Sequence, residues 1–483
     1  MTGDGWPDAV ADVLIIGAGV VGAAIARTLA GYQLSCLLVD AASDVGAGTS
    51  KANTAILHTG FDAEPGSLES RLLRRGSQLL ADYARQAGIP VERTGALLVA
   101  WTPEQEAALP AIADKARRNG VTDLSHRGSA EVYQAEPHLG PGARAGLLIP
   151  GESIICPWTT TLAYATEAVR TGVRLLLRTH VLDVRPGPDQ YEVRTSRGPL
   201  RCRWLINAAG LYSDQIDRML GGESFTITPR RGELIVFDKL ARPLLSSILL
   251  PVPTARTKGV LVAPTVYGNV LLGPTAEDVV DRADTATTAA GLAGLLDAGG
   301  RLMPELVAEE VTATYVGLRA ATEHRDYQIR VDEQLRYACA GGIRSTGLSA
   351  SLGIAEYLTG QLGAAGLPLA SRETAGPPAM PYLGQAGPRP YQDAAQIAAD
   401  PEYGRIVCHC ERVSRGEIRD ALTSTLPPAD LDGLRRRTRA CNGRCQGFYC
   451  AATVSELLMG RLPSPPPPPA TSPEPARPAG SAP

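Results

Sequence analysis

The stretch DVLIIGAGVVG, residues 12–22, decides the fold of this chain. Its apolar, β-branched half predicts a buried strand, and the Ala-rich segment 23–30 behind it predicts a helix. The glycines between them have G-x-G-x-x-G spacing: Gly17 permits a tight turn, Gly19 lets backbone approach a pyrophosphate, and Gly22 lets the helix pack close to the strand. Because amide groups at a helix N-terminus favour a diphosphate, the stretch predicts the first βα unit of a dinucleotide-binding domain.

A second apolar run at 35–39 ends in Asp40, which is expected at the tip of the neighbouring strand. An acid in that place can accept hydrogen bonds from a ribose. The alternative is an ordinary glycine turn before a core helix, with Asp40 as a solvated strand end. The motif by itself fits NAD and FAD equally.

Length and net charge limit the classes of protein to which this chain can belong. The 483 residues suggest roughly two to four domains, and a net charge of −3 gives no basic footprint for nucleic acid. The chain has no apolar run of transmembrane length, and residues 1–12 are acidic, unlike a signal peptide. These features predict a cytoplasmic protein, with a peripheral membrane contact left open.

The remaining chain predicts one α/β domain interrupted by another. A second strand, glycine loop and helix are expected over 337–362, and Pro-rich short strands fill 225–320. The expected fold is a Rossmann-like cofactor-binding domain with an inserted antiparallel, β-rich substrate domain and a small C-terminal α-helical cysteine module. The cofactor-binding parts are placed roughly at 10–85, 145–220 and 320–365, the substrate-domain parts roughly at 86–144 and 221–319, a linker at 366–404, the module at 405–461 and a disordered Pro-rich tail at 462–483.

Five of the nine cysteines crowd into the C-terminal module: Cys408, Cys410, Cys441, Cys445 and Cys450. The C-x-C pair puts two thiolates within reach of one iron, and two more from the 444–450 segment would complete the four ligands of a 2Fe–2S cluster. Zinc is the alternative, although C-x-C is not the common C-x₂-C spacing. Disulfides are not expected in a cytoplasmic chain.

Several further motifs follow one another in a recognisable order. They are GAGVVG at 17–22, TSKANT at 49–54, ILHTG at 56–60, NAAG at 207–210, VGLR at 316–319 and GGIRSTGLSAS at 341–351. Together they resemble the FAD-dependent oxidoreductase family of D-amino-acid oxidase type over about residues 10–365. Within that family the chain is most similar to FAD-dependent glycerol-3-phosphate dehydrogenases, notably those of the anaerobic type. VCHCERVSRGEI at 407–418 and RRRTRACNGRCQGFYC at 435–450 resemble the bacterioferritin-associated-ferredoxin-like domain of that same enzyme type, which carries a 2Fe–2S cluster in relatives.

The resemblance implies FAD as the cofactor, with hydride passing from a substrate C–H bond to the flavin. It implies that residues from several segments hold the cofactor. The ADP half is assigned to Gly17, Gly19, Gly22 and Asp40, the flavin side to Ser50, Lys51, Asn53 and Thr54, the adenine to the backbone around Val181, the ribose and pyrophosphate to Ala209, Gly210 and Asp214, and the isoalloxazine surroundings to Gly342, Gly347, Leu348 and Ser349.

His58 is the candidate catalytic base, because it lies in the cofactor-facing loop and a base near neutral pKa eases hydride loss from an alcohol. The alternative is a histidine that hydrogen-bonds the flavin or simply packs. Arg319 and Arg344 stand where the family has anion-binding arginines, and Arg231 is a third candidate for the substrate site. The alternative for each arginine is a structural salt bridge.

For the metal centre, the family pattern points to Cys408, Cys410, Cys445 and Cys450 as the ligands. The family usually has glycine at the position of Cys441, so this cysteine is a departure: either an extra thiol or an alternative ligand.

These implications predict an enzyme that oxidises sn-glycerol 3-phosphate to dihydroxyacetone phosphate and passes electrons through a 2Fe–2S centre to a quinone or partner subunit. The alternatives are an L-2-hydroxy-acid dehydrogenase of the 2-hydroxyglutarate type, an opine or amino-acid oxidase, and a non-catalytic redox sensor. The paired arginines and the substrate domain argue against a sensor, but they do not separate a phosphate from a carboxylate.

Overall fold

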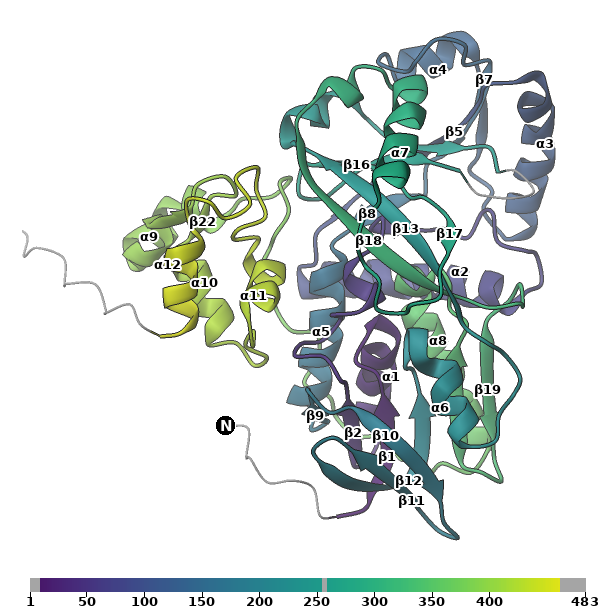
Figure 1. Cartoon of the computed structure of the whole chain (residues 1–483), viewed down its shortest axis with the longest axis vertical. Coiled ribbons are helices and arrows are strands. Elements are labelled where there is room, and N and C mark those ends of the chain that lie inside the picture. The colour runs from purple at the N-terminus through teal and green to yellow at the C-terminus, as the bar shows by residue number, and fades with distance from the viewer. Residues whose placement is uncertain (1–8, 254–258, 461–483) are drawn as a thin grey trace, which may run out of the picture.

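The computed structural model describes residues 9–253 and 259–460. A large body built on two sheets carries a small module at its side, yellow-green in Figure 1. The Pro-rich tail expected at 462–483 lies outside the described residues. Within the two described ranges, no helix is both long and apolar enough to cross a membrane.

The first sheet is organised around β1 (Ala11–Ile16), which lies between two parallel neighbours, β2 (Cys36–Val39) and β12 (Gly198–Asn207). Since parallel strands are covered on both faces, β1 is apolar nearly throughout and almost fully buried. Parallel strands β9 (Arg174–Leu176) and β20 (Tyr337–Gly341) extend the sheet beyond β2 and β12, while β10 (Val181–Pro186), β11 (Tyr191–Thr195) and β19 (Gln328–Asp332) pair antiparallel at its margins.

The helices beside this sheet are α1 (Val20–Ala30), α2 (Leu68–Ala87), α5 (Pro157–Arg170), α6 (Ser213–Met219) and α8 (Gly347–Ala364). Helices α1, α6 and α8 contact its strands, whereas α5 packs mainly on α1 and α2 packs mainly on α8. Helices α2 and α8 cross through glycines: a Cβ on Gly76 would lie 2.5 Å from the Ser349 oxygen, and one on Gly353 would lie 2.3 Å from the Leu72 oxygen. The two backbones therefore touch directly, which fixes the start of α8.

The second sheet is mainly antiparallel and is built from the inserted segments. Its strands run in the order β17-β13-β16-β15-β14-β5-β7-β6, with the long β18 beside β13. Their bounds are β5 (Ala96–Ala100), β6 (Ser125–Gly128), β7 (Ala145–Ile149), β13 (Thr228–Phe237), β14 (Ile248–Pro251), β15 (Leu261–Pro264), β16 (Val270–Gly273), β17 (Glu277–Asp278) and β18 (Val311–Ala321). Helices α3 (Pro103–Arg118), α4 (Ser129–Ala135) and α7 (Ala289–Leu302) accompany it.

The expected α/β fold with an inserted β-rich unit is confirmed. One strand lies elsewhere than the sequence suggests: β7 pairs with β5 in the second sheet, although its first residue, Ala145, is expected at the start of a cofactor-binding part. Small strands β3 (Ile56–Leu57), β8 (Ser153–Ile155) and β4 (Val91–Glu92) form a third sheet.

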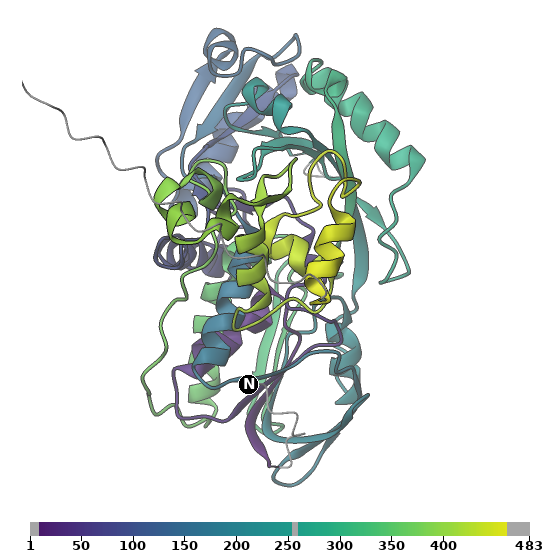
Figure 2. The same cartoon turned by 90° about the vertical axis from the view of Figure 1, so that its left-hand side faces the viewer.

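The C-terminal module has its own small core, which includes Val413, Ile418, Leu434 and Val454. It consists of β21 (Ile406–Cys408), β22 (Val413–Ser414), α10 (Arg415–Leu422), α11 (Leu431–Thr438) and α12 (Ala451–Leu458). A linker with α9 (Ala394–Ala399) leads into it. Turned by 90°, the module lies in front of the large body (Figure 2), and α11 contacts α5.

Candidate flavin site and cysteine cluster

The glycine turn between β1 and α1 has a backbone that only glycine fits. Gly17 has φ +103°, and a Cβ there would lie 2.3 Å from the Ala208 oxygen at the end of β12. A Cβ on Gly22 would lie 1.8 Å from the Gly17 oxygen. Gly19 is the N-cap of α1 and makes no side-chain hydrogen bond to the first turn, where the Val20 amide is covered by Ser50 Oγ instead. This is the cradle that a diphosphate requires.

Asp40 braces this turn from the end of β2. Its carboxylate accepts hydrogen bonds from the amides of Ala18 and Ala42, at 2.6 and 2.8 Å. Burial raises the pKa of Asp40, and the two amide hydrogen bonds act in the opposite direction. A role in holding the ribose stays a prediction.

The 49–54 loop lies against the start of α1. The Ser50 hydroxyl accepts a hydrogen bond from the Val20 amide at 2.9 Å. The Asn53 side chain donates to the Ser50 carbonyl and accepts from the Ala55 amide, so it links the two sides of the loop that contains Thr54. The Lys51 ammonium instead pairs with Asp432 of α11 at 2.8 Å, so this residue joins the loop to the cysteine module.

His58 is held by a buried carboxylate that the sequence did not single out. Its Nδ1 lies 3.0 Å from Glu152 Oε2, and Glu152 Oε1 accepts from the amide and hydroxyl of Thr59, both at 2.7 Å. With Nδ1–H donating to the carboxylate, the lone pair of the neutral ring is on Nε2. The His58 amide donates to Ser349 Oγ at 2.9 Å, which joins His58 to the first turn of α8.

Arg319, on β18, is a largely desolvated cation. It donates to the carbonyls of Thr275 and Arg231, and no carboxylate in the described ranges lies within salt-bridge distance of its guanidinium. Burial, with the nearby charge of Arg230, lowers the pKa of Arg319 to about 10, although Asp278 raises it. An anion would satisfy this guanidinium.

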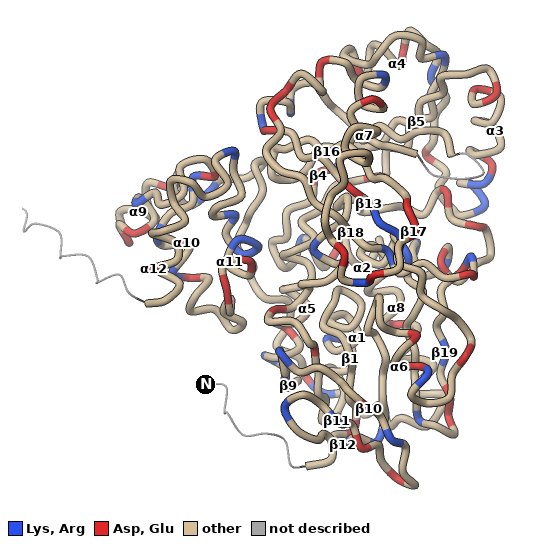
Figure 3. Tube along the Cα trace, in the orientation of Figure 1, with Lys and Arg blue, Asp and Glu red and all other residues tan. Residues whose placement is uncertain are grey.

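The other two candidate arginines already have acidic partners. Arg344 lies 3.1 Å from Glu69, and Arg231 lies 2.7 Å from Asp284. Figure 3 shows basic residues of β13 beside acidic residues of β17 in this region. Of the three, Arg319 therefore best fits the expected anion site.

The remaining candidate cofactor residues lie at three places. Ala209 and Gly210 follow β12 beside the glycine turn, and the buried Val181 begins β10. The loop before α8 and the first turn of that helix contain Gly342, Gly347, Leu348 and Ser349. Asp214 is different, because Arg282, Arg218 and the Ile227 amide all bind its buried carboxylate. Burial raises the pKa of Asp214, but these contacts outweigh it and the pKa is lowered. Asp214 thus fastens α6 to the inserted segment.

The five cysteine thiols of the module gather at one end, around the loop that precedes α12. Cys408, Cys441 and Cys450 are buried, whereas Cys410 and Cys445 are half-buried. The Sγ atoms of Cys441 and Cys450 are 3.6 Å apart. The amide of Tyr449, followed by those of Gly447 and Phe448, lowers the pKa of Cys445, whereas burial raises the pKa of Cys408 and of Cys450 to about 11.

Cys410 neighbours Cys445, and Cys450 neighbours both Cys408 and Cys441. Within the part of the chain that the structure covers, no three potential ligands already converge as a single-ion site would require. A cluster of two irons bound by four thiolates suits such a donor set. Cys441 has φ +64°, a left-handed conformation that favours glycine.

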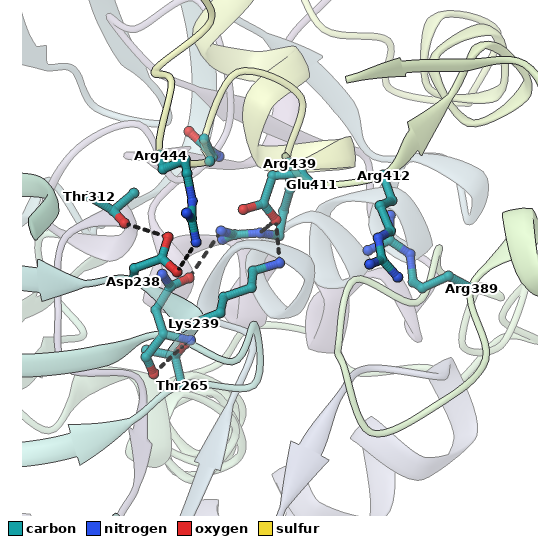
Figure 4. Close-up of polar contacts among 12 residues, drawn as sticks. Asp238, Lys239, Thr265, Thr312, Arg389, Glu411, Arg412, Arg439 and Arg444 are labelled. Carbon is teal, nitrogen blue, oxygen red and sulfur yellow. Dashed lines mark hydrogen bonds and ion pairs between the residues drawn. The ribbon is translucent and has the colours of Figure 1, made fainter. Parts of the chain in front are cut away.

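Charged side chains fasten the module to the large body. Asp44, in the loop after β2, lies 2.7 Å from Arg436 and 2.6 Å from Arg437 of α11, with all three buried. Arg444 pairs with Asp238 at 2.7 Å (Figure 4). Because a buried charge is stable only with its partner, these contacts specify one docked position.

Comparisons with known proteins agree with both halves of this arrangement. Residues 12–361 match the family described as FAD dependent oxidoreductase, and residues 406–459 match the BFD-like [2Fe-2S] binding domain. A glycerol 3-phosphate dehydrogenase of Caloramator mitchellensis is 33% identical over 454 residues, which cover 93% of this chain and 94% of that protein. A glycerol 3-phosphate oxidase of Mycoplasma pneumoniae is 31% identical, over 70% of this chain and 91% of its own length.

Among solved structures, the dithionite-reduced L-α-glycerophosphate oxidase of Mycoplasma pneumoniae with FAD bound has a TM-score of 0.71. It is 29% identical and covers 75% of this chain and 97% of its own. FAD and a 2Fe–2S cluster are the cofactors that the two matched families bind, and the glycine cradle and the gathered thiols fit them. The chain is therefore an FAD-dependent oxidoreductase of this family, with a C-terminal BFD-like 2Fe–2S domain.

Proposed function

We propose that the chain oxidises sn-glycerol 3-phosphate to dihydroxyacetone phosphate and sends the electrons onward through its 2Fe–2S centre. One observation carries the substrate class: Arg319 is a desolvated guanidinium without an acidic partner among the described side chains. Guanidinium groups bind phosphate through two parallel hydrogen bonds. The similarity to a glycerol 3-phosphate dehydrogenase along nearly the whole chain, module included, supports the same reaction.

His58 is the proposed base. Its Nε2 takes the proton of the substrate hydroxyl on the carbon that is oxidised, while Glu152 holds Nδ1–H and stabilises the imidazolium that forms. FAD, when bound, supplies the hydride acceptor. Glu152 acts through His58 and is therefore a positioning residue.

Arg319 is proposed to bind the phosphate, and the paired Arg344 to assist at its edge. Arg231 would have to exchange Asp284 for the substrate, which makes it the weaker candidate. The same guanidinium would bind the carboxylate of an L-2-hydroxy acid, so that dehydrogenase is the second candidate, and an opine or amino-acid oxidase is the third.

The onward electron path and the cellular location belong to the same proposal. Electrons leave the cluster for a quinone or a partner subunit, and the enzyme works in the cytoplasm or at a membrane surface. The proposed cluster ligands are Cys408, Cys410, Cys445 and Cys450.

An anaerobic absorbance titration of the purified holoenzyme tests the substrate. Glycerol 3-phosphate, L-2-hydroxyglutarate and a mixture of amino acids are added to separate samples, and bleaching of the flavin band is recorded. We expect bleaching by glycerol 3-phosphate alone. Bleaching by the hydroxy acid alone, or by amino acids alone, would refute the assignment in favour of the corresponding candidate.

A further inference from the structure

Two aromatic rings stack between the 49–54 loop and the module. Trp158, in the first turn of α5, and Tyr267, in the β15–β16 turn, have ring centroids 5.0 Å apart and planes inclined by 22°. The Trp158 indole N–H donates to the Lys51 carbonyl at 3.0 Å. The stack therefore begins at the loop that is expected to contact the flavin.

The cysteine module contacts the side of the stack through Arg439. Its guanidinium lies 4.1 Å from the centroid of the Tyr267 ring and 5.9 Å from that of the Trp158 ring, and Arg439 is two residues before Cys441. Its Nε donates to Glu411 at 2.7 Å, and Glu411 directly follows Cys410 (Figure 4). Arg439 thus contacts Tyr267 while it ties together the two chain segments that carry the thiols.

The Arg439–Glu411 contact is buried, and both side chains make further hydrogen bonds to the large body. Glu411 also accepts from Lys239 of the large body at 3.0 Å, and Arg439 donates to Asn269, beside Tyr267, at 3.3 Å. Tyr267, Glu411 and Arg439 are all buried. A buried ion pair contributes little net stability, but removing one partner is severely destabilising, so such a network selects one geometry rather than tightening a loose contact.

We propose that Trp158 and Tyr267 form the path by which electrons cross from the flavin to the 2Fe–2S cluster, and that Arg439 is the positioning residue that holds the module against this path. The inference rests on the proposed onward transfer. In each crossing the reduced flavin loses one electron and the oxidised cluster gains one. Since a hydride brings two electrons to the flavin, a full turnover requires two such crossings, and the cluster passes each electron to an external one-electron acceptor such as ferricyanide.

The test separates reduction of the flavin from reduction of the cluster. The variants are Tyr267→Leu and Trp158→Leu, each with a Phe counterpart that keeps the ring. Tyr391→Leu is the control, because Arg412 lies 5.7 Å from the centroid of that ring in a tyrosine–arginine contact that involves neither Trp158 nor Tyr267. Flavin in the anaerobic holoenzyme is reduced by light with EDTA, and cluster reduction is followed by freeze-quench electron paramagnetic resonance.

We expect flavin reduction at the native rate in every variant, and cluster reduction slower on the order of tenfold in both Leu variants. The Phe variants and the control stay close to the native rate. Native-rate cluster reduction in the Leu variants would overturn the path. Iron loss in both Leu variants, with iron retained in the control, would also overturn it and leave only a packing role.

Arg439→Lys tests the positioning role, because lysine keeps the charge but loses the planar contact with Tyr267. We expect slower cluster reduction, an unchanged resonance spectrum and faster hydrogen exchange over residues 406–418. Hydrogen exchange and cluster reduction at the native rates would refute the positioning role of Arg439. Because light replaces the substrate, failure of glycerol 3-phosphate to bleach the flavin would refute the proposed function and leave this test intact.

Discussion

Replacing Arg319 with methionine should separate activity from stability. Burial lowers the pKa of Arg319 to about 10. Since one pKa unit corresponds to about 1.4 kcal/mol, its surroundings disfavour the charged form by about 3 kcal/mol. Its hydrogen bonds to the Thr275 and Arg231 carbonyls offset about 1–2 kcal/mol of this. We therefore expect Arg319→Met to leave the free energy of unfolding unchanged within about 1 kcal/mol, or to raise it.

The same change should remove the substrate's main anion contact. A charge-assisted pair of hydrogen bonds contributes about 3 kcal/mol, so kcat/KM for glycerol 3-phosphate should fall by about 10². Urea unfolding and steady-state kinetics with ferricyanide measure the two quantities. Arg144→Met is the control, because Arg144 is exposed and paired with Glu106 at 2.7 Å. A variant with native kcat/KM that is destabilised by more than about 2 kcal/mol would show that Arg319 is structural and refute the reasoning.

Three further outcomes are expected. Glu152→Gln should lower the rate of flavin reduction by about 10², because His58 loses the carboxylate that orients it and stabilises its charged form; an unchanged rate and pH profile in stopped-flow measurements would exclude this role. Cys408→Ser should lose iron while substrate still bleaches the flavin, and native iron content by colorimetric assay would contradict the ligand assignment. Cys441→Gly should keep its iron and gain about 1 kcal/mol in thermal unfolding, because φ +64° suits glycine; loss of the cluster spectrum would instead make Cys441 a ligand.

Sequence spacing predicted the features that are set by neighbouring residues. The spacing of the glycines in the first turn lies within six residues and is readable from the sequence, although one of the contacts that require glycine, with the Ala208 backbone, comes from a distant segment. The crowding of five cysteines was equally visible. In both cases the chemistry is carried by a short segment whose residues stay together in any fold.

The partners of charged side chains could not be predicted in this way. Lys51 pairs with Asp432, 381 positions along the chain, and Asp214 pairs with Arg282 of the inserted segment. Glu152, which holds His58, stands in a turn between two short strands and has no motif of its own. Such pairings depend on how distant segments pack, and a motif read in isolation does not contain that information.

The crossing of α2 and α8 links the proposed base to a glycine in the middle of a supporting helix. Gly76 lies directly against the carbonyl of Ser349, and the hydroxyl of that serine accepts a hydrogen bond from the amide of His58. A single methyl group added to the middle of α2 would displace α8 and, with it, the proposed base. The position of the proposed base is therefore set partly by the absence of a side chain on a supporting helix, and a side chain at Gly76 would displace that base as well as strain the helix crossing.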